Sequence, residues 1–139
     1  MEKNTLVIEI KRPVATVFKF TLNPKNTPKW IPSIIKEKIF DRVAKVGTIY
    51  YQKVAGENNK SKPALVVTGL VKNKQLDFHA INKKYSCSYR YETIPSGTRV
   101  VYSEENGVGG KIESPMKMKN LQALKKLIEK QAKTVKNNA

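Results

Sequence analysis

Residues 12–30 have the sequence RPVATVFKFTLNPKNTPKW, and this stretch decides the fold. Pro13 can begin a helix, because the amide that proline lacks would have no partner in the first helical turn. Val14, Val17 and Phe18 then begin an apolar stripe at spacings of three and four residues. The first half of the stretch therefore predicts a short helix with one apolar face.

The second half of the stretch contains prolines that keep any further helix short. Asn23-Pro24 ends the first helix and can begin another, since Asn is a good N-cap. Pro28 and Pro32 leave room for only a turn or two. The stretch therefore predicts two short helices with a bend, and Trp30 is expected to anchor them. Such a pair buries little apolar surface by itself, so it needs a larger element against which to pack.

Seven segments outside this stretch have the alternating apolar pattern of β-strands. In the first segment, Leu6 and Ile10 share one face, and in the second Ile35 and Ile39 alternate with lysines and with Glu37. Short polar turns separate the last six segments, which predicts an antiparallel meander. The predicted strands are residues 5–11, 33–41, 46–54, 63–72, 75–82, 85–94 and 98–105.

The last segment has a helical period. Ser114-Pro115 can begin this helix, because proline suits the first helical turn, and the helix is expected to run from Glu113 to about Val135. One face of an antiparallel sheet must be covered, and this helix is the obvious cover, so the sequence predicts an α+β domain. The apolar face contains Leu121, Leu124, Ile128, Ala132 and Val135, and it is widened by Met116, Met118 and Leu127.

Composition limits the class of protein. The chain has 139 residues, 40% of them hydrophobic, which predicts a single folded domain over residues 1–139. No apolar run approaches the roughly 20 residues that a membrane span needs, and the N-terminus has no signal-peptide pattern. The single cysteine excludes an internal disulfide. Together these features predict a cytoplasmic protein.

The net charge is +16, but its chemistry argues against specific nucleic-acid recognition. Only four of the 27 basic residues are arginines, and the lysines are scattered along the chain. Arginine makes the bidentate contacts that DNA readers prefer. We therefore expect no specific nucleic-acid partner and at most weak association with anionic surfaces. Oligomeric state is left open.

The residues with reactive side chains do not form a catalytic or metal-binding pattern. His79 is the only histidine, and alternation places it opposite Leu76 on a face that is expected to be solvent. Cys87 is expected to be a buried, inert thiol, since a nucleophile needs a base nearby. The sequence GVGGK at 107–111 fails the phosphate-loop motif, because Glu105 and Ile112 occupy its first Gly and its Ser/Thr positions. We expect no metal and no cofactor.

Seven short motifs occur in a fixed order along the chain. They are IKRPVATVF at 10–18, NP at 23–24, WIP at 30–32, VGT at 46–48, LDF at 76–78, GTRV at 97–100 and LQALKKLIE at 121–129. Together these motifs resemble the polyketide cyclase/dehydrase-like branch of the START/Bet v 1 superfamily. The resemblance implies a helix-grip fold, in which a seven-stranded curved antiparallel sheet wraps around a long C-terminal helix. It also implies an internal apolar cavity that holds a lipid-like or polyketide-like molecule.

The tyrosines of the sixth strand are the strongest sign of such a cavity. Tyr85, Cys87, Tyr89 and Tyr91 share one face. Tyrosine suits a wall that touches an amphipathic ligand, whereas a core of pure packing more often uses aliphatic residues. The alternative is that these tyrosines face solvent. The expected cavity residues are Ile10, Phe78, Tyr89, Tyr91, Val100, Tyr102, Leu121, Leu124 and Ile128.

Two other functions stay open beside ligand binding. The resemblance suggests that an enzyme of this kind would carry out cyclase or dehydratase chemistry, with Tyr89, Tyr91 or Glu105 as proton donors. The sequence contains no base–nucleophile pair to support that chemistry, so we assign no catalytic residue. A related branch resembles activators of the Hsp90 ATPase, and a protein of that kind would bind a partner through the lysine face of its last helix.

Overall fold

A computed structural model describes the backbone of residues 2–56, 60–107 and 110–138, and the side chains of these residues up to position 131. The side chains of the expected inward positions Ala132 and Val135 are therefore not described, and residues 108–109 of the GVGGK loop lie outside the described residues. The elements are β1 (Glu2–Ile10), α1 (Val14–Leu22), α2 (Thr27–Trp30), β2 (Ile34–Lys38), β3 (Ile49–Val54), β4 (Lys62–Val71), β5 (Gln75–Ala80), β6 (Tyr85–Ile94), β7 (Gly97–Asn106) and α3 (Met118–Asn138).

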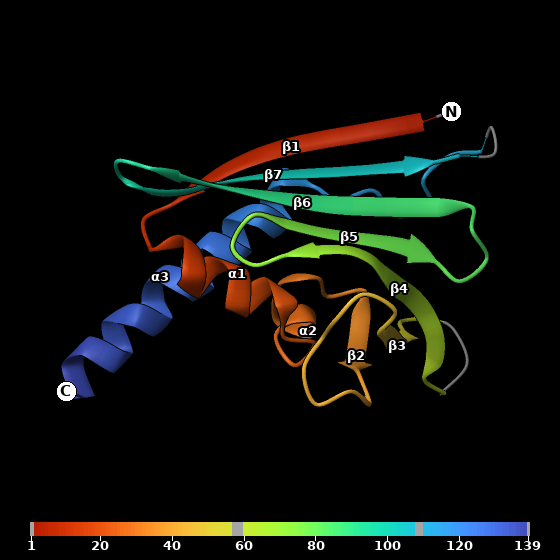
Figure 1. The fold of residues 1–139 in the computed structure, drawn as a ribbon, viewed down its shortest axis with the longest axis horizontal. Helices are drawn as coiled ribbons and strands as arrows, with labels where there is room; N and C mark the ends of the chain where they lie inside the picture. Colours follow the sequence, from red (N-terminus) through yellow and green to blue (C-terminus); the bar gives the residue numbers. More distant parts are fainter. Residues whose placement is uncertain (1, 57–59, 108–109, 139) are drawn as a thin grey trace.

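The strands form one antiparallel sheet of seven strands in the order β1-β7-β6-β5-β4-β3-β2. Strands β2 to β7 are the expected meander. Strand β1 pairs with β7, so β1 and β2 lie at opposite edges (Figure 1). The bent pair α1–α2 carries the chain from one edge to the other, which explains why the prolines interrupt a helix at this point.

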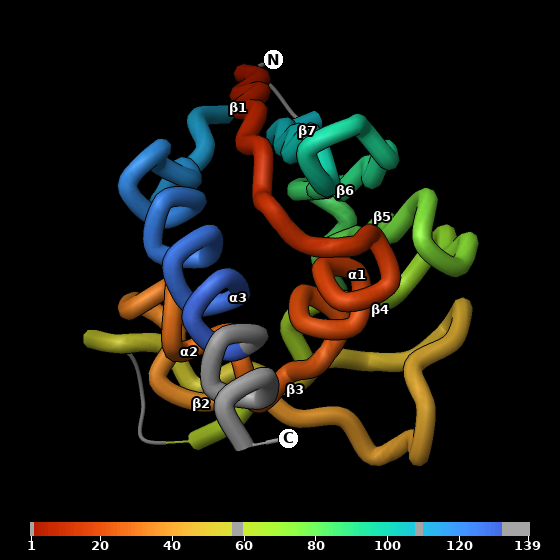
Figure 2. The backbone as a smooth tube through the Cα atoms, turned by 90° about the vertical axis from the view of Figure 1, so that its left-hand side faces the viewer, coloured from red at the N-terminus to blue at the C-terminus, as the bar shows by residue number. Residues whose placement is uncertain are grey.

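The helices lie inside the curve of the sheet. Figure 2 shows the strands curving around α1, with α3 on the side opposite β5. Leu121, Leu124 and Ile128 of α3 are completely buried, and Ile10 and Val17 join the same core. The seven-stranded curved sheet around a long C-terminal helix confirms the helix-grip prediction.

The last helix begins later than expected, at Met118. The amide of Met116 donates to the carboxylate of Glu104 at 2.6 Å, and the amide of Ile112 donates to Glu2 at 3.3 Å. Because these amides bond to side chains on the sheet, the residues before Met118 are not helical. The side chain of Asn120 then accepts from the amide of Lys117 at 3.1 Å and satisfies one amide at the start of the helix.

Strand β2 is shorter than predicted, and its burial pattern differs. The pairing of β2 with β3 shifts register between Ile34 and Lys36, which leaves Ile35 52% exposed. Glu37 is buried instead and bonds to Thr27. Alternation along one strand could not reveal this inversion, because a bulge changes which side chains point inward.

The helix cover gives the first prediction. Replacing Leu124 with Ala should lower the free energy of unfolding by about 2–5 kcal/mol, because the substitution leaves a cavity in the core. Replacing the exposed Lys126 of the same helix with Ala should change it by less than about 0.5 kcal/mol. Urea unfolding followed by circular dichroism measures both values. Equal effects would contradict the packing of α3 on the sheet.

Candidate functional site in the interior of the sheet

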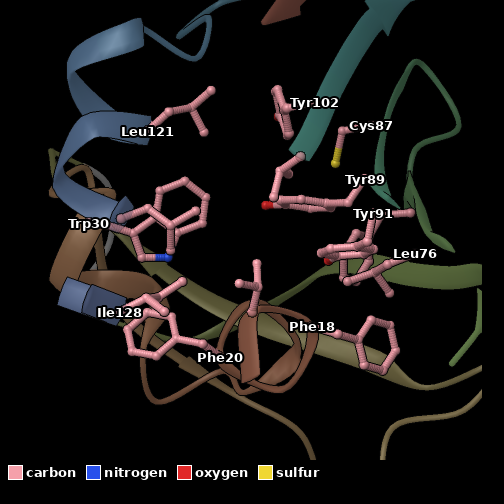
Figure 3. Close-up of a cluster of buried hydrophobic side chains, with 14 of the residues drawn as sticks. Phe18, Phe20, Trp30, Leu76, Cys87, Tyr89, Tyr91, Tyr102, Leu121 and Ile128 are labelled. Atoms are coloured by element: carbon pink, nitrogen blue, oxygen red, sulfur yellow. The ribbon is translucent and has the colours of Figure 1, made fainter. Parts of the chain in front are cut away.

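The structure buries all nine residues that the sequence analysis selected. They come from β1, β5, β6, β7 and α3, and each is less than a tenth exposed. Tyr89 lies opposite Tyr102, and Tyr91 lies opposite Val100, in the pairing of β6 with β7. Because alternate residues of paired strands share a face, these four side chains point together into the interior. Figure 3 shows Tyr89, Tyr91 and Tyr102 facing the helix residues Leu121 and Ile128.

The tyrosines of β6 form an aromatic cluster in the interior, which excludes the alternative that Tyr89 and Tyr91 face solvent. Their two rings lie 6.2 Å apart and nearly parallel. Tyr102 meets Tyr89 edge to face at 5.1 Å, and Phe18 of α1 meets Tyr91 in the same way at 5.3 Å. Such pairs contribute stability beyond the burial of their area. The cluster joins the sheet to α1.

The hydroxyl of Tyr91 already has a partner in the protein. It lies 2.5 Å from the hydroxyl oxygen of Thr21, which itself donates to the carbonyl of Phe18 at 3.0 Å. Since a threonine hydroxyl has one proton, Tyr91 must donate to Thr21. Tyr91 is thus engaged in holding α1 on the sheet.

The hydroxyl of Tyr89, unlike that of Tyr91, makes no hydrogen bond within the described residues, although Tyr89 is only 7% exposed. Burial raises the pKa of this hydroxyl well above its usual value, so it remains a neutral donor. In Figure 3 it points from the sheet toward Trp30 and α3.

Trp30 presents a second polar group without a partner. Trp30 is 2% exposed. Its backbone carbonyl accepts a hydrogen bond from the side chain of Asn120 at 3.0 Å, which fastens α2 to α3. This agrees with its expected role as an anchor. The buried indole N–H, however, has no hydrogen-bond partner among the described residues. A buried donor left unpaired costs about 1–3 kcal/mol, so such groups in native proteins usually have an acceptor.

A buried carboxylate that the sequence analysis missed lies at one end of the interior. Glu104 is 3% exposed and accepts four hydrogen bonds. One oxygen accepts from the hydroxyls of Tyr85 at 2.6 Å and Tyr102 at 3.1 Å. The other accepts from the side chain of Asn4 at 2.7 Å and the amide of Met116 at 2.6 Å. Glu104 therefore ties β1, β6, β7 and the segment before α3 together.

Glu105, which was considered as a proton donor, does not face the interior. It is paired with the exposed Lys3 at 3.8 Å. Glu104 follows Val100 and Tyr102 at every second position of β7, so their shared face was readable from the sequence. The same alternation places Glu105 on the outer face, away from the interior tyrosines.

Glu37 is a second buried acid. Its two oxygens accept from the hydroxyl of Thr27 at 2.5 Å and from the side chain of Gln52 at 2.6 Å. Burial raises the pKa of this carboxyl, while the two hydrogen bonds oppose that shift. These bonds connect α2, β2 and β3, so the role of Glu37 is structural.

His79 and Cys87 lie on opposite faces of the sheet, as expected. His79 is exposed on the outer face, while Cys87 is buried in the core. Burial raises the pKa of the Cys87 thiol to about 12. Within the described residues, no three His, Cys, Asp or Glu side chains gather as metal ligands would.

A shallow groove of about 360 Å³ lies along the sheet, mostly on its outer face. Its walls include Thr5, Ser88 and Ser103, and the ion pair of Arg90 with Asp77 at 2.6 Å. This polar groove does not suit an apolar molecule. The interior between the sheet and α3 is therefore the better candidate for such a ligand.

Known structures share this arrangement of elements. The chain matches a protein from Nitrosomonas europaea at 17% identity with a TM-score of 0.73, over 94% of this chain and 96% of that one. It matches the Bet v 1 allergen Ara h 8.0201 at 17% identity with a TM-score of 0.68, over 93% and 98%. The chain has a START/Bet v 1-like fold.

A third match to this START/Bet v 1-like fold is the di-domain aromatase/cyclase StfQ of the steffimycin biosynthetic pathway. The identity is 12% and the TM-score 0.67, over 94% of this chain and 51% of StfQ. No protein-family model and no curated protein matches the amino-acid sequence. In the described part of the chain, no helix is both long and apolar enough to cross a membrane.

The four bonds of Glu104 give the second prediction. Replacing Glu104 with Gln should lower the free energy of unfolding by about 1.5–3 kcal/mol, because the amide nitrogen cannot accept from the donors that surround it. Glu105→Gln is the matched control on the opposite face, and its effect should be below about 0.5 kcal/mol. Urea unfolding measures both. The network is refuted if the two variants are equally stable.

The burial of Cys87 gives the third prediction. In the folded protein at pH 8 iodoacetamide should not alkylate this thiol, because it is shielded and its raised pKa leaves almost no thiolate. After unfolding in guanidinium chloride the single cysteine should react completely. Intact-mass spectrometry before and after treatment detects the added group. Rapid alkylation without denaturant would show that the sheet does not protect Cys87.

Proposed function

We propose that the interior between the sheet and α3 binds a small, mostly apolar molecule that carries a hydrogen-bond acceptor. The observation that supports this most directly is a pair of donors that have no partner among the described residues, the Trp30 indole N–H and the Tyr89 hydroxyl. Around them the interior walls are apolar or aromatic, including Leu121, Leu124 and Ile128. Apolar walls with a few polar groups are typical of small-molecule sites.

The two donors favour a carbonyl, carboxyl or ether oxygen as the polar group of the ligand. They come from opposite sides of the interior, Trp30 from α2 and Tyr89 from β6 (Figure 3). Because both can donate, a ligand oxygen with two lone pairs could satisfy one or both. A saturated hydrocarbon would leave both donors unpaired, which costs affinity. We therefore expect the ligand to be a lipid-like or polyketide-like molecule that has an oxygen atom able to accept a hydrogen bond.

Binding without catalysis is the better-supported function. StfQ acts as an aromatase/cyclase, and the expectation from sequence was that an enzyme here would use Tyr89, Tyr91 or Glu105. Burial raises the pKa of both tyrosines, and an efficient general acid has a pKa near the working pH. Glu105 is on the outer face. Tyr89, Tyr91 and Glu105 therefore do not provide an acid and a base that both face the interior.

The fourth prediction compares Tyr89 with Tyr91. Tyr89→Phe should weaken binding of a medium-chain methyl ketone by about 0.5–1.5 kcal/mol, because it removes a donor to the ligand. Tyr91→Phe should leave this affinity nearly unchanged, since that hydroxyl is bonded to Thr21. Isothermal titration calorimetry measures the affinities. The melting temperature of wild-type protein should rise with ligand by mass action.

The alkane of equal length is the ligand control. It lacks an acceptor, so the substitution of Tyr89 should not weaken its binding. Native mass spectrometry of gently purified protein would identify a co-purified ligand. If neither ketone nor alkane binds the wild-type protein, the ligand-binding proposal fails and a protein-binding function takes its place. The cytoplasmic location stays a prediction from the sequence.

A further inference from the structure

The most exposed large apolar side chains of the described residues gather in one short part of the chain. They are Phe40 at 73%, Val43 at 69%, Val46 at 60% and Ile35 at 52% exposed. The first three belong to the β2–β3 loop, residues 39–48, which projects from the molecule at the lower right of Figure 2. Single exposed apolar residues are ordinary, but a group of three in one loop marks an interaction surface.

The fold holds this loop in shape. Ala44 and Thr48 are buried, and the amide of Gly47 donates to the carbonyl of Val67 at 2.8 Å. The amide of Val67 donates in turn to the carbonyl of Thr48 at 2.9 Å. The Thr48 hydroxyl donates to the Asp41 carboxylate at 2.5 Å. Buried residues and backbone hydrogen bonds thus fix the conformation of the loop, and in this conformation its apolar side chains are exposed.

Basic side chains surround the exposed apolar ones. Arg42 and Lys45 are exposed within the same loop, and the ammonium of Lys38 lies 5.2 Å from the centre of the Phe40 ring. The acidic residue of the loop, Asp41, is also exposed and accepts a hydrogen bond from Thr48, so the two basic residues outnumber it. The outer surface of the loop is therefore apolar and positively charged.

We propose that the β2–β3 loop docks on an anionic lipid bilayer. Phe40, Val43 and Val46 would enter the boundary between headgroups and acyl chains, and Arg42 and Lys45 would contact anionic headgroups. The net charge of +16 supports this partner, because it attracts the whole molecule to a negative surface.

A fluid bilayer suits this surface better than a protein partner does. A stable protein interface buries roughly 800 Å² on each side and requires a complementary shape. Here the apolar side chains belong to one projecting loop, which a bilayer can accommodate without a matching hollow. The combination of a few apolar side chains and basic neighbours is also typical of proteins that lie on anionic membranes.

Vesicle co-sedimentation tests the proposal. The wild-type protein should bind phosphatidylcholine–phosphatidylserine vesicles and not vesicles of phosphatidylcholine alone, and added salt should weaken binding. Phe40→Ser with Val43→Ser should weaken binding by roughly tenfold or more, because the inserted apolar area is lost. Arg42→Glu with Lys45→Glu should weaken it at least as much, by reversing two charges at the surface.

Two control variants make the same chemical changes elsewhere. Val71→Ser with Ile81→Ser removes two exposed apolar side chains from other parts of the surface. Lys119→Glu with Lys126→Glu reverses two exposed charges on α3. Both controls should bind within roughly threefold of wild type, since long-range attraction depends little on two distant charges out of the total. Circular dichroism should show that all four variants fold as the wild type does.

A fluorescent variant reports insertion directly. Phe40→Trp places a new indole in the loop, while the native Trp30 is buried and does not contact solvent. Its emission should shift to the blue on binding anionic vesicles, and brominated lipid should quench it. Absence of wild-type binding, equal binding to neutral vesicles, equal weakening by the control variants, or an unchanged Trp emission would each overturn the proposal.

Discussion

Leu121, Leu124 and Ile128 of α3 are fully buried against the concave face of the sheet, and this contact organises the molecule. A curved antiparallel sheet exposes one apolar face unless another element covers it. Helix α3 lies across that face, while α1 and α2 fill the space inside the curve. The properties of the interior depend on this cover, because the helix shields the tyrosines of β6 and β7 from water.

Buried polar groups then give the interior its particular character. Glu104 accepts four hydrogen bonds and thereby joins β1, β6 and β7 to the segment before α3. Glu37 has a similar structural role between α2 and β3. In contrast, Tyr89 and Trp30 keep donors without partners among the described residues. This difference separates the acids that hold the fold together from the two donors on which the ligand-binding proposal rests.

The outer surface has a second feature, the exposed apolar and basic side chains of the β2–β3 loop. The β2–β3 loop combines exposed apolar side chains with Arg42 and Lys45, although the loop base is buried and hydrogen-bonded. Scattered lysines alone would give weak and unspecific attraction to anionic surfaces. In the proposed docking, the local clustering of apolar and basic side chains would give that attraction a direction, with the β2–β3 loop toward the bilayer.

The sequence by itself determined the element order, the bent helix pair, the meander and the nine interior positions, because period and proline placement are local properties. Tertiary structure alone decided which of two interior hydroxyls holds α1: Tyr89 and Tyr91 are equivalent by alternation, and only the position of Thr21 distinguishes them. It also decided the burial of Glu37 and the exposure of Ile35, through a bulge with no local signal. Alternation along β7 would have revealed Glu104, but its four partners come from distant parts of the chain and meet only in the folded protein.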